Sequence, residues 1–407
     1  MSEVMDVPAA TEPSPMNYMP AQSFHGEAAP GGPLPLEALL SEIAARREEF
    51  ERLRHVPPDA VALMKRAGIY RASTPRRFGG DALPPSTFMR TLERIAAVDG
   101  SAAWVAAFGS ANIYLASLPL ATQAQIYATG PDQVFAGGLH PMQPGTRVEG
   151  GWRASGRWHF ASGCKGAAWL GVGTGGTTGP ASDPGPIRPL TAVFPAAEVE
   201  IVENWDVVGM RGTGSHDLRL RDKVVRDEWT FLRGTGSQVD EPLYRYPAIA
   251  YQAGVHAVVN VGLARAALDL VTGMADGPKG MTGAPRLADR AYFRAQLGRA
   301  EAGWRSARAF FYEASDQAWD SILAGDPVTP EQASLIRLSA IFAAQTSADV
   351  VQQAFRLGGI AAIRDTHPLQ RMVRDSMVVT QHAFLNEMVY ENAGAILTGT
   401  APTPPYP

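Results

Sequence analysis

The sequence contains almost no cysteine, no surplus of basic residues and no long apolar run. Cys164 is the one cysteine among 407 residues, which excludes an internal disulfide and a zinc site built from cysteines. There are 36 Lys and Arg residues against 40 Asp and Glu residues, and the formal net charge of −4 argues against a nucleic-acid partner. No run of 18 apolar residues is present, and the N-terminus, MSEVMDVPAATEPSP, shows no secretory signal. We therefore expect a cytoplasmic protein without a membrane partner.

The residues that are present are sufficient for a large core, because 45% are hydrophobic and 19% are charged. Residues 1–33, rich in Pro, Ala and Gly, predict a disordered tail. Residues 34–129 show helical spacing and predict an N-terminal helical domain. Residues 130–238 alternate between apolar and polar residues, with turn glycines between the segments, and predict a β-domain. Residues 239–400 predict long helices with short connections, as in a four-helix bundle. The fold class predicted is α+β, mostly α.

One helix of the predicted bundle has a clear beginning. In the segment TPEQASLIRLSAIF, Thr329 is placed to cap the helix, Pro330 takes its first position and Gln332 its third. A capping threonine with glutamine three residues later is the pattern of a capping box, and proline is favoured at the first helical position. The sequence therefore predicts that a helix starts at Pro330.

The segment GVGTGG, residues 171–176, matches the glycine spacing of a dinucleotide-binding turn. Such a turn must lead directly into a helix, whose N-terminus holds the phosphates. Here the chain continues as TTGPASDPGP, which cannot be helical. We therefore predict a loop in the β-domain and no nucleotide site.

Two further stretches carry residues of uncertain role. In GRWHFASG, a regular strand would place Trp158, Phe160 and Ser162 on one face, which could line a flat heteroaromatic ligand or belong to the core. In RDSMVVTQHAFLNEMV, residues 374–389, helical spacing would place His382 in an otherwise apolar stripe. Such a histidine is either a core residue satisfied by a hydrogen bond or part of a site.

The order of the three parts, together with several motifs, resembles the acyl-CoA dehydrogenase superfamily. The motifs are RRFGG at residues 76–80, RWHFASG at 157–163 and AFRLGGIAAI at 354–363. Three further segments, DGSAAWV, GMRGTGSHDL and HPLQRMVRD, are similar to the oxygenase components of two-component flavin-dependent monooxygenases, often called group D. The resemblance covers about residues 35–400.

The resemblance implies an enzyme that receives reduced flavin, FMN or FAD, from a separate reductase. Dioxygen would form a C4a-hydroperoxyflavin that hydroxylates an aromatic or heteroaromatic small molecule. Ser162 would bond near flavin N5, and Phe160 and Trp104 would form walls of the flavin and substrate sites. Gly358 and Gly359 would approach the flavin of a neighbouring subunit, which implies a homotetramer. No metal is implied.

The sequence departs from the dehydrogenase pattern at the end of the chain. No Tyr-Glu-Gly follows Arg374 and Asp375, and the next carboxylate is Glu387. His382 stands where the hydroxylases place a histidine beside the substrate, so we expect it to act as a base there. An acyl-CoA dehydrogenase or oxidase, an N- or S-oxygenating relative and a non-catalytic flavin-fold binding protein remain open as alternatives.

A second departure concerns the substrate. Phenol hydroxylases of this group commonly have a histidine eight residues after the tryptophan that corresponds to Trp104, and Asn112 occupies that position here. An amide can hydrogen-bond a substrate but cannot titrate. We therefore expect Asn112 and Trp104 to contact the substrate. An indole, a sulfur heterocycle, an amine or a polyketide-type phenol is as acceptable as a simple phenol.

Overall fold

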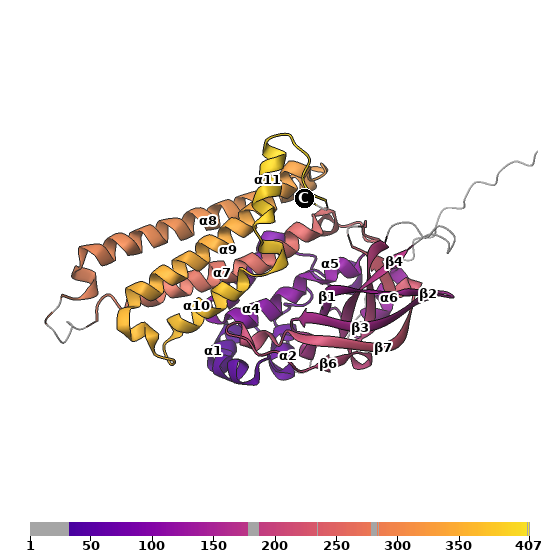
Figure 1. Cartoon of the computed structure of the whole chain (residues 1–407), viewed down its shortest axis with the longest axis horizontal. Coiled ribbons are helices and arrows are strands. Elements are labelled where there is room, and N and C mark those ends of the chain that lie inside the picture. The colour runs from indigo at the N-terminus through magenta and orange to yellow at the C-terminus, as the bar shows by residue number, and fades with distance from the viewer. Residues whose placement is uncertain are drawn as a thin grey trace, which may run out of the picture.

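The computed structural model describes residues 32–177, 187–233, 235–277, 283, 285–404 and 406. The predicted tail therefore lies outside the described residues except for its last two positions. The described chain forms a helical N-terminal part, a β-sheet and a bundle of long helices (Figure 1). The bundle lies on the left of the view and the sheet on the right, with the N-terminal helices beneath and between them. This arrangement confirms the predicted α+β class.

The N-terminal part consists of short helices that begin at prolines or at a polar cap. Pro58 and Pro85 occupy first-turn positions, where the missing N–H costs no hydrogen bond. Asp99 caps α4 by accepting a hydrogen bond from the Ala102 backbone N–H at 2.8 Å. The helices are α1 (Leu36–Leu53), α2 (Pro58–Arg66), α3 (Pro85–Val98), α4 (Gly100–Ala106), α5 (Asn112–Leu115) and α6 (Leu120–Ile126).

The middle of the chain forms one mixed sheet in the order β6-β7-β3-β1-β4-β5-β8, with β2 paired to β3. β1 and β4 are parallel and the other pairs are antiparallel. The β2–β3 pair is the hairpin that the turn glycines predict. The strands are β1 (Phe135–Pro144), β2 (Thr146–Val148), β3 (Gly151–Ala161), β4 (Trp169–Thr177), β5 (Ile187–Pro195), β6 (Glu200–Val202), β7 (His216–Arg226) and β8 (Thr230–Leu232).

The predicted loop at GVGTGG is wrong, because these residues lie in the middle of β4. The glycines are required by close packing. A Cβ on Gly171 would lie 2.8 Å from the Phe135 ring, and one on Gly173 would lie 2.5 Å from the Leu139 carbonyl oxygen. The glycine-rich pattern therefore lets strands and rings approach closely and does not form a phosphate-binding turn.

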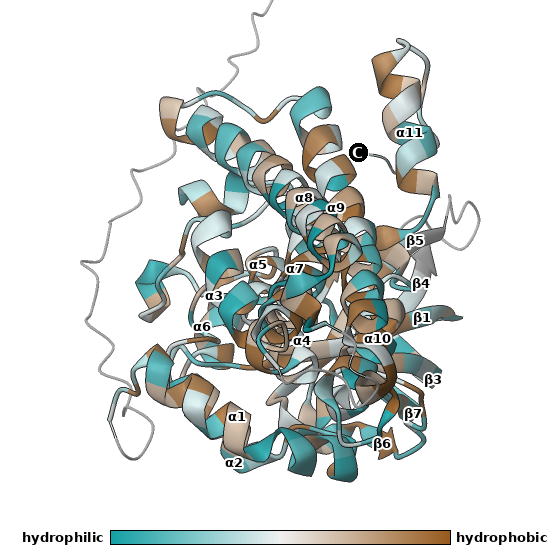
Figure 2. Cartoon of the chain, turned by 90° about the vertical axis from the view of Figure 1, so that its left-hand side faces the viewer, coloured by the Kyte–Doolittle hydropathy of each residue, from teal (hydrophilic) through white to brown (hydrophobic). Residues whose placement is uncertain are grey.

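The C-terminal part is built around α7 (Ala248–Gly273), which lies against α8 (Ala291–Ala324), α9 (Pro330–Gly358) and α10 (Pro368–Val379). Figure 2 shows α7 near the centre of this assembly, with α3 and α4 of the N-terminal part against it. By length and apolar composition α7 could cross a membrane, but 78% of its most apolar window is buried by other parts of the protein, as in a core helix. The predicted capping box of α9 is confirmed.

The predicted continuous helix over residues 374–389 is wrong. α10 ends at Val379, and a new helix, α11 (Met388–Leu397), turns away from it near the C-terminus (Figure 1). Polar side chains satisfy the backbone between the two helices. The Thr380 hydroxyl donates to the Met377 carbonyl at 2.7 Å, and the Asn386 side chain accepts from the Met388 N–H at 3.0 Å. His382 therefore lies in a turn and not in an apolar helical stripe.

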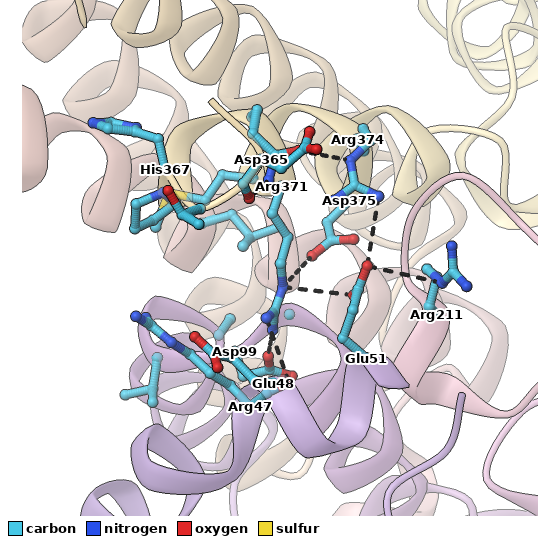
Figure 3. A pocket seen from close by; sticks show the side chains of 18 of the residues that line it. Arg47, Glu48, Glu51, Asp99, Arg211, Asp365, His367, Arg371, Arg374 and Asp375 are labelled. Atoms are coloured by element: carbon cyan, nitrogen blue, oxygen red, sulfur yellow. Dashed lines mark hydrogen bonds and ion pairs between the residues drawn. The ribbon is translucent and has the colours of Figure 1, made fainter. Parts of the chain in front are cut away.

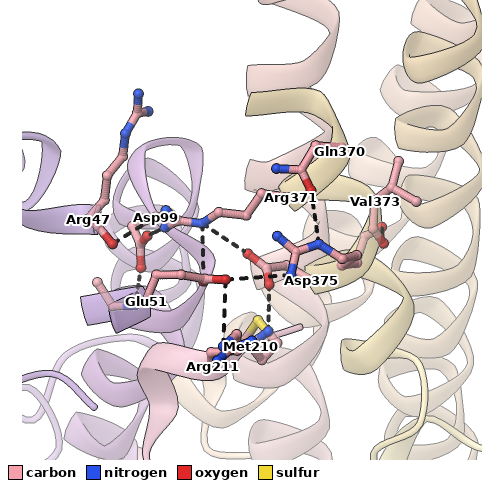
Figure 4. A network of polar contacts seen from close by, with 12 residues as sticks. Arg47, Glu51, Asp99, Met210, Arg211, Gln370, Arg371, Val373 and Asp375 are labelled. Atoms are coloured by element: carbon pink, nitrogen blue, oxygen red, sulfur yellow. Dashed lines mark hydrogen bonds and ion pairs between the residues drawn. The ribbon is translucent and has the colours of Figure 1, made fainter. Parts of the chain in front are cut away.

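A buried ionic network joins the three parts of the chain (Figure 4). Arg371 of α10 pairs with Asp99 at the start of α4, and its Nε lies 3.7 Å from Asp375. Asp375 accepts a hydrogen bond from the Met210 backbone N–H, in the loop before β7, at 2.5 Å. Glu51 of α1 lies 3.8 Å from Arg371. The arginine side chain is 17% exposed, and those of Asp99 and Asp375 are 0% and 3% exposed.

We expect Arg371→Met to destabilise the protein strongly, because it leaves buried carboxylates without their cation. Breaking a buried pair in this way costs about 3–5 kcal/mol. The measurement is urea or thermal unfolding monitored by circular dichroism at neutral pH.

The matched control is Arg153→Met, which removes an exposed ion pair between Arg153 and Asp222 on the sheet. An exposed pair contributes at most about 1 kcal/mol. Equal losses for the two variants would show that the buried network does not hold the three parts together.

Candidate active site

Four aromatic side chains from three segments meet between the N-terminal helices and the bundle. The rings of His256, from α7, and His382, from the turn after α10, stack with centroids 4.2 Å apart and planes 11° apart. Trp104 of α4 lies edge-on to both, at 4.4 Å from His256 and 5.3 Å from His382. Phe384 lies 5.0 Å from His382. The four rings form an aromatic surface that carries ring nitrogens.

A chain of hydroxyl groups begins at the other edge of Trp104. The indole N–H donates to Ser162 Oγ at 3.1 Å, and this oxygen lies 2.6 Å from Ser215 Oγ. Ser215 Oγ lies 2.7 Å from the Thr213 hydroxyl, which donates to the Met210 carbonyl at 2.8 Å. Since Thr213 donates to Met210, Ser215 donates to Thr213 and Ser162 donates to Ser215. One lone pair of Ser162 Oγ therefore stays available to accept from a ligand.

The prediction that Trp158, Phe160 and Ser162 share a face is wrong. The pairing of β3 with β7 shifts between Trp158 and Ala161, and Phe160 has a φ of 64°. This bulge turns Phe160 outward, so that its side chain is 64% exposed while Trp158 is fully buried. Phe160 lies edge-on to Trp205 at 6.4 Å between ring centroids. Its exposed ring is free to be covered by a flat ligand.

Burial sets the charge of both histidines. It lowers the pKa of His256 to about 4, with a small opposing effect from the Gln252 backbone. Burial also lowers the pKa of His382 well below its ordinary value, and His256 adds to this effect. Both imidazoles are therefore neutral at neutral pH.

His256 was not predicted from the sequence. The available signal was a line of polar residues on one face of α7, since Gln252, His256 and Asn260 are spaced four residues apart within residues 248–264, which are otherwise apolar. All three are buried. Asn260 hydrogen-bonds the Ala344 and Ser376 carbonyls and ties the helices together, whereas His256 reaches the aromatic cluster.

Asn112 is not brought to the aromatic cluster by any contact. It is fully buried, and its amide N–H₂ donates to the Tyr70 carbonyl at 3.0 Å, to Thr74 Oγ1 at 2.9 Å and to the Gln133 carbonyl at 3.3 Å. These contacts join the N-terminal helices to the segment before β1. The amide donors are already used by the protein, so the substrate contact stays a prediction that would have to use the amide oxygen, which has no partner among the described residues.

Gly358 and Gly359 lie at the end of α9, apart from the aromatic cluster. A Cβ on Gly358 would lie 2.9 Å from Leu369 Cδ1 and 3.0 Å from Ala362 Cβ, so a larger residue here would displace neighbouring side chains. Gly359 adopts φ 59° and ψ −148°, a conformation essentially restricted to glycine. The following short turn exposes two apolar side chains, with Ile360 82% exposed and Ile363 59% exposed.

A cavity lies at the ionic network (Figure 3). It has a volume of about 450 Å³ and is lined by charged groups, including Arg47, Glu48, Glu51 and Arg371. These charges pair largely with one another, as the dashed lines show. No Phe, Tyr or Trp of the described chain lines this cavity, so the aromatic cluster is the better candidate for a site that takes a flat substrate.

The residues around Ser162 suit a reduced flavin. The N5–H of a reduced flavin is a hydrogen-bond donor, and Ser162 offers a neutral acceptor whose own proton is committed to Ser215. The Trp104 ring lies beside that hydroxyl, and the exposed Phe160 ring, two residues earlier in the chain, offers a flat apolar surface. Ser162 and Trp104 therefore form one functional group in which the indole orients the serine.

Comparisons with known proteins identify the family of the chain. Residues 254–387 match the family described as acyl-CoA dehydrogenase, C-terminal domain. The chain is 47% identical to the indole-3-acetate monooxygenase of Pseudomonas putida over 372 residues, which cover 91% of this chain and 95% of the relative. It is 26% identical to a flavin-dependent monooxygenase oxygenase subunit of Rhodococcus jostii over 363 residues, covering 86% and 93% of the two chains. The crystal structure of 3-HSA hydroxylase from Rhodococcus sp. RHA1 superposes with a TM-score of 0.83 at 26% identity, covering 90% of this chain and 96% of that one.

The chain therefore belongs to the oxygenase components of flavin-dependent monooxygenases, which share the fold of the acyl-CoA dehydrogenases. This confirms the resemblance noted in its motifs. It also confirms the enzyme class and the requirement for flavin and oxygen.

Replacing Asn112 by alanine tests its structural role. We expect the variant to lose three buried hydrogen bonds and to unfold at a lower temperature, since each net bond contributes about 0.5–1.5 kcal/mol. The dissociation constant for an aromatic substrate should not change. The amide oxygen is buried and has no donor among the described residues, so a weakened affinity in a normally stable variant would support the substrate contact.

Proposed function

We propose that this protein hydroxylates an indole acid such as indole-3-acetate, using reduced flavin supplied by a separate reductase. The observation that carries the proposal is the position of Trp104, which touches Ser162 with one edge and the two histidines with its ring. The tryptophan thus separates a hydroxyl site suited to flavin from an aromatic site suited to a flat substrate. The relative from Pseudomonas putida supplies the substrate class.

The roles of the residues follow from their contacts. Ser162 would accept a hydrogen bond from the flavin, and Trp104 holds the serine in place and would exclude water. Phe160 would cover the flavin. When bound, the reduced flavin, FMN or FAD, supplies the electrons that activate dioxygen. His382 contacts the substrate together with His256 on the opposite side of Trp104.

The contacts of the histidine pair favour hydroxylation over acyl-CoA dehydrogenation. Removal of a weakly acidic proton beside a thioester needs a strong, positioned base, usually a carboxylate. Among the described residues, the stacked histidines contact aromatic rings and backbone groups, and no carboxylate forms a hydrogen bond or ion pair with either ring. A cytoplasmic location suits an enzyme that depends on a diffusing reduced flavin.

The assay is direct. Purified protein, a flavin reductase, NADH and FAD or FMN are incubated in air with indole-3-acetate, and product and hydrogen peroxide are both quantified. We expect hydroxylated indole product with indole-3-acetate and no crotonyl product with butyryl-CoA. If reduced flavin yields only peroxide with every aromatic acid tested, indole acids are not the substrates of this enzyme.

Ser162→Ala should uncouple the reaction. Without the serine oxygen the flavin loses one hydrogen bond worth about 1.5–3 kcal/mol, so peroxide release per product should rise about tenfold to a hundredfold. Trp104→Phe should act in the same direction, because it removes the N–H that holds Ser162 and keeps a flat ring.

The control for this pair is Ser155→Ala, in the neighbouring strand β3. The Ser155 hydroxyl contacts only the backbone of β7, and its bond to the Leu220 carbonyl is long, at 3.4 Å. The peroxide-to-product ratio of this variant should match the wild type. A wild-type peroxide-to-product ratio in Ser162→Ala would show that Ser162 takes no part in the reaction.

We further propose that the enzyme is a homotetramer and that the turn after α9 belongs to a subunit interface. Two exposed isoleucines beside a glycine in a restricted conformation support this. Gly358 and Gly359 would then let the backbone approach the flavin of the neighbouring subunit, as the motif resemblance implies.

Ile360→Glu should dissociate the oligomer without disturbing the fold, because the side chain is 82% exposed within one chain. Light scattering should show a smaller species, and flavin affinity should fall at least about tenfold. The control is Leu323→Glu, which also replaces an exposed apolar side chain by a charged one, at a position on α8 that is 60% exposed. A fully active monomeric wild type would contradict the proposal.

A further inference from the structure

The stacked histidines differ in the hydrogen bonds that their Nδ1 atoms form. His256 Nδ1 lies 2.6 Å from the Gln252 carbonyl oxygen, one helical turn earlier in α7. A carbonyl oxygen can only accept, so this Nδ1 carries the proton. A neutral imidazole has one proton, and His256 Nε2 is therefore a bare acceptor.

His382 has the opposite arrangement. The Phe384 backbone N–H lies 3.3 Å from His382 Nδ1, and a backbone N–H can only donate. His382 Nδ1 is therefore the acceptor in the neutral ring, and its proton lies on Nε2. The two rings stack as opposite tautomers, one with an acceptor and one with a donor at Nε2.

Neither Nε2 forms a hydrogen bond with any described residue. His256 is 8% exposed, so its ring lies in a largely enclosed setting. The low pKa of both rings keeps them neutral at physiological pH, which preserves the two tautomers. A free acceptor and a free donor on adjacent parallel rings form a ready site for a molecule that carries both groups.

We propose that His256 Nε2 accepts the ring N–H of the substrate while His382 Nε2–H donates to an oxygen, which assigns His256 as the specificity-determining residue for indoles. The inference rests on the proposed function and deepens it. His256 on α7 would thus be the second histidine of the site. Position 112, where related phenol hydroxylases commonly have a histidine, is an asparagine in this chain. The inference also changes the expected role of His382 from base to hydrogen-bond donor.

The pair recognises the substrate and does not titrate with it. A ring that resists protonation is a poor acceptor of a complete proton but a competent acceptor of a hydrogen bond. An analogue without the N–H leaves the His256 acceptor unpaired in an enclosed site, which disfavours its binding. Discrimination between an indole and its N-methyl derivative is therefore the signature of this pair.

The test compares the anaerobic dissociation constants of indole-3-acetate and 1-methylindole-3-acetate in the wild type and in variants. The wild type should bind the methylated acid at least about tenfold more weakly. In His256→Leu this ratio should approach one, and in His256→Gln, whose amide oxygen can accept, part of it should return. His382→Leu is the matched control and should keep the ratio while both affinities fall.

Each result has a distinct meaning. A wild-type ratio of one, or an unchanged ratio in a folded His256→Leu variant, overturns the assignment even if indole-3-acetate is hydroxylated. If neither acid binds or reacts, the proposed substrate fails and the inference fails with it. Melting curves on the same preparations show whether each variant is folded, and His256→Gln provides the answer if the leucine variant is not.

The tautomers can also be observed directly. Long-range ¹⁵N–¹H spectra of protein labelled at histidine should show one ring protonated at Nδ1 and one at Nε2, assigned by their disappearance in His256→Leu and His382→Leu. Neither pattern should change between pH 6 and pH 8. Two rings of the same tautomer, or titration within this range, would contradict the proposal.

Discussion

The ion pair between the buried Arg371 of α10 and Asp99 is the interaction on which the rest of the structure depends. Arg371 pairs with Asp99, and Asp99 also caps α4, the helix that carries Trp104. Arg371 lies beside Asp375, which fixes the Met210 backbone at the start of the loop that supplies Thr213 and Ser215. Both ends of the hydroxyl chain at Ser162 therefore depend on one guanidinium group.

The buried ionic network favours one defined arrangement of the helices and loops over maximal stability. Burying several charges costs free energy that their attraction only partly returns, so apolar residues of similar size would often be at least as stable. Burial raises the pKa of Asp375 to about 7, even though Arg371 and the Met210 N–H favour its charged form. A network of this kind forms fully only when α1, α4, the loop before β7 and α10 are all in register (Figure 4).

The sequence predicted those features that depend on local patterns. The order of helices, strands and helices, the β2–β3 hairpin and the capping box of α9 each follow from spacing within a short window. The network explains why DGSAAWV, GMRGTGSHDL and HPLQRMVRD are informative together, since Asp99, Met210 and Arg371 meet in space.

The failures share a different cause, which is tertiary context. Phe160 leaves the expected face because of a bulge set by pairing with β7, and no window of β3 contains that partner. The helix at His382 ends because Thr380 and Asn386 satisfy the backbone locally. His256 was not predicted because it lies in a mostly apolar helix that resembles a core helix. Only its contacts with His382 and Trp104 in the folded chain point to a functional role.

The proposed site combines a hydroxyl acceptor for a flavin with neutral ring nitrogens for a substrate, and no carboxylate among the described residues pairs with its histidines. Such a site can orient an electron-rich ring and exclude water, while oxygen and flavin supply the chemistry. The most direct measurement is a single turnover with photochemically reduced flavin, indole-3-acetate and ¹⁸O₂, without reductase or nicotinamide, followed by mass spectrometry. The account predicts product that carries one ¹⁸O atom. Product labelled from water, or no product without a nicotinamide, would contradict it.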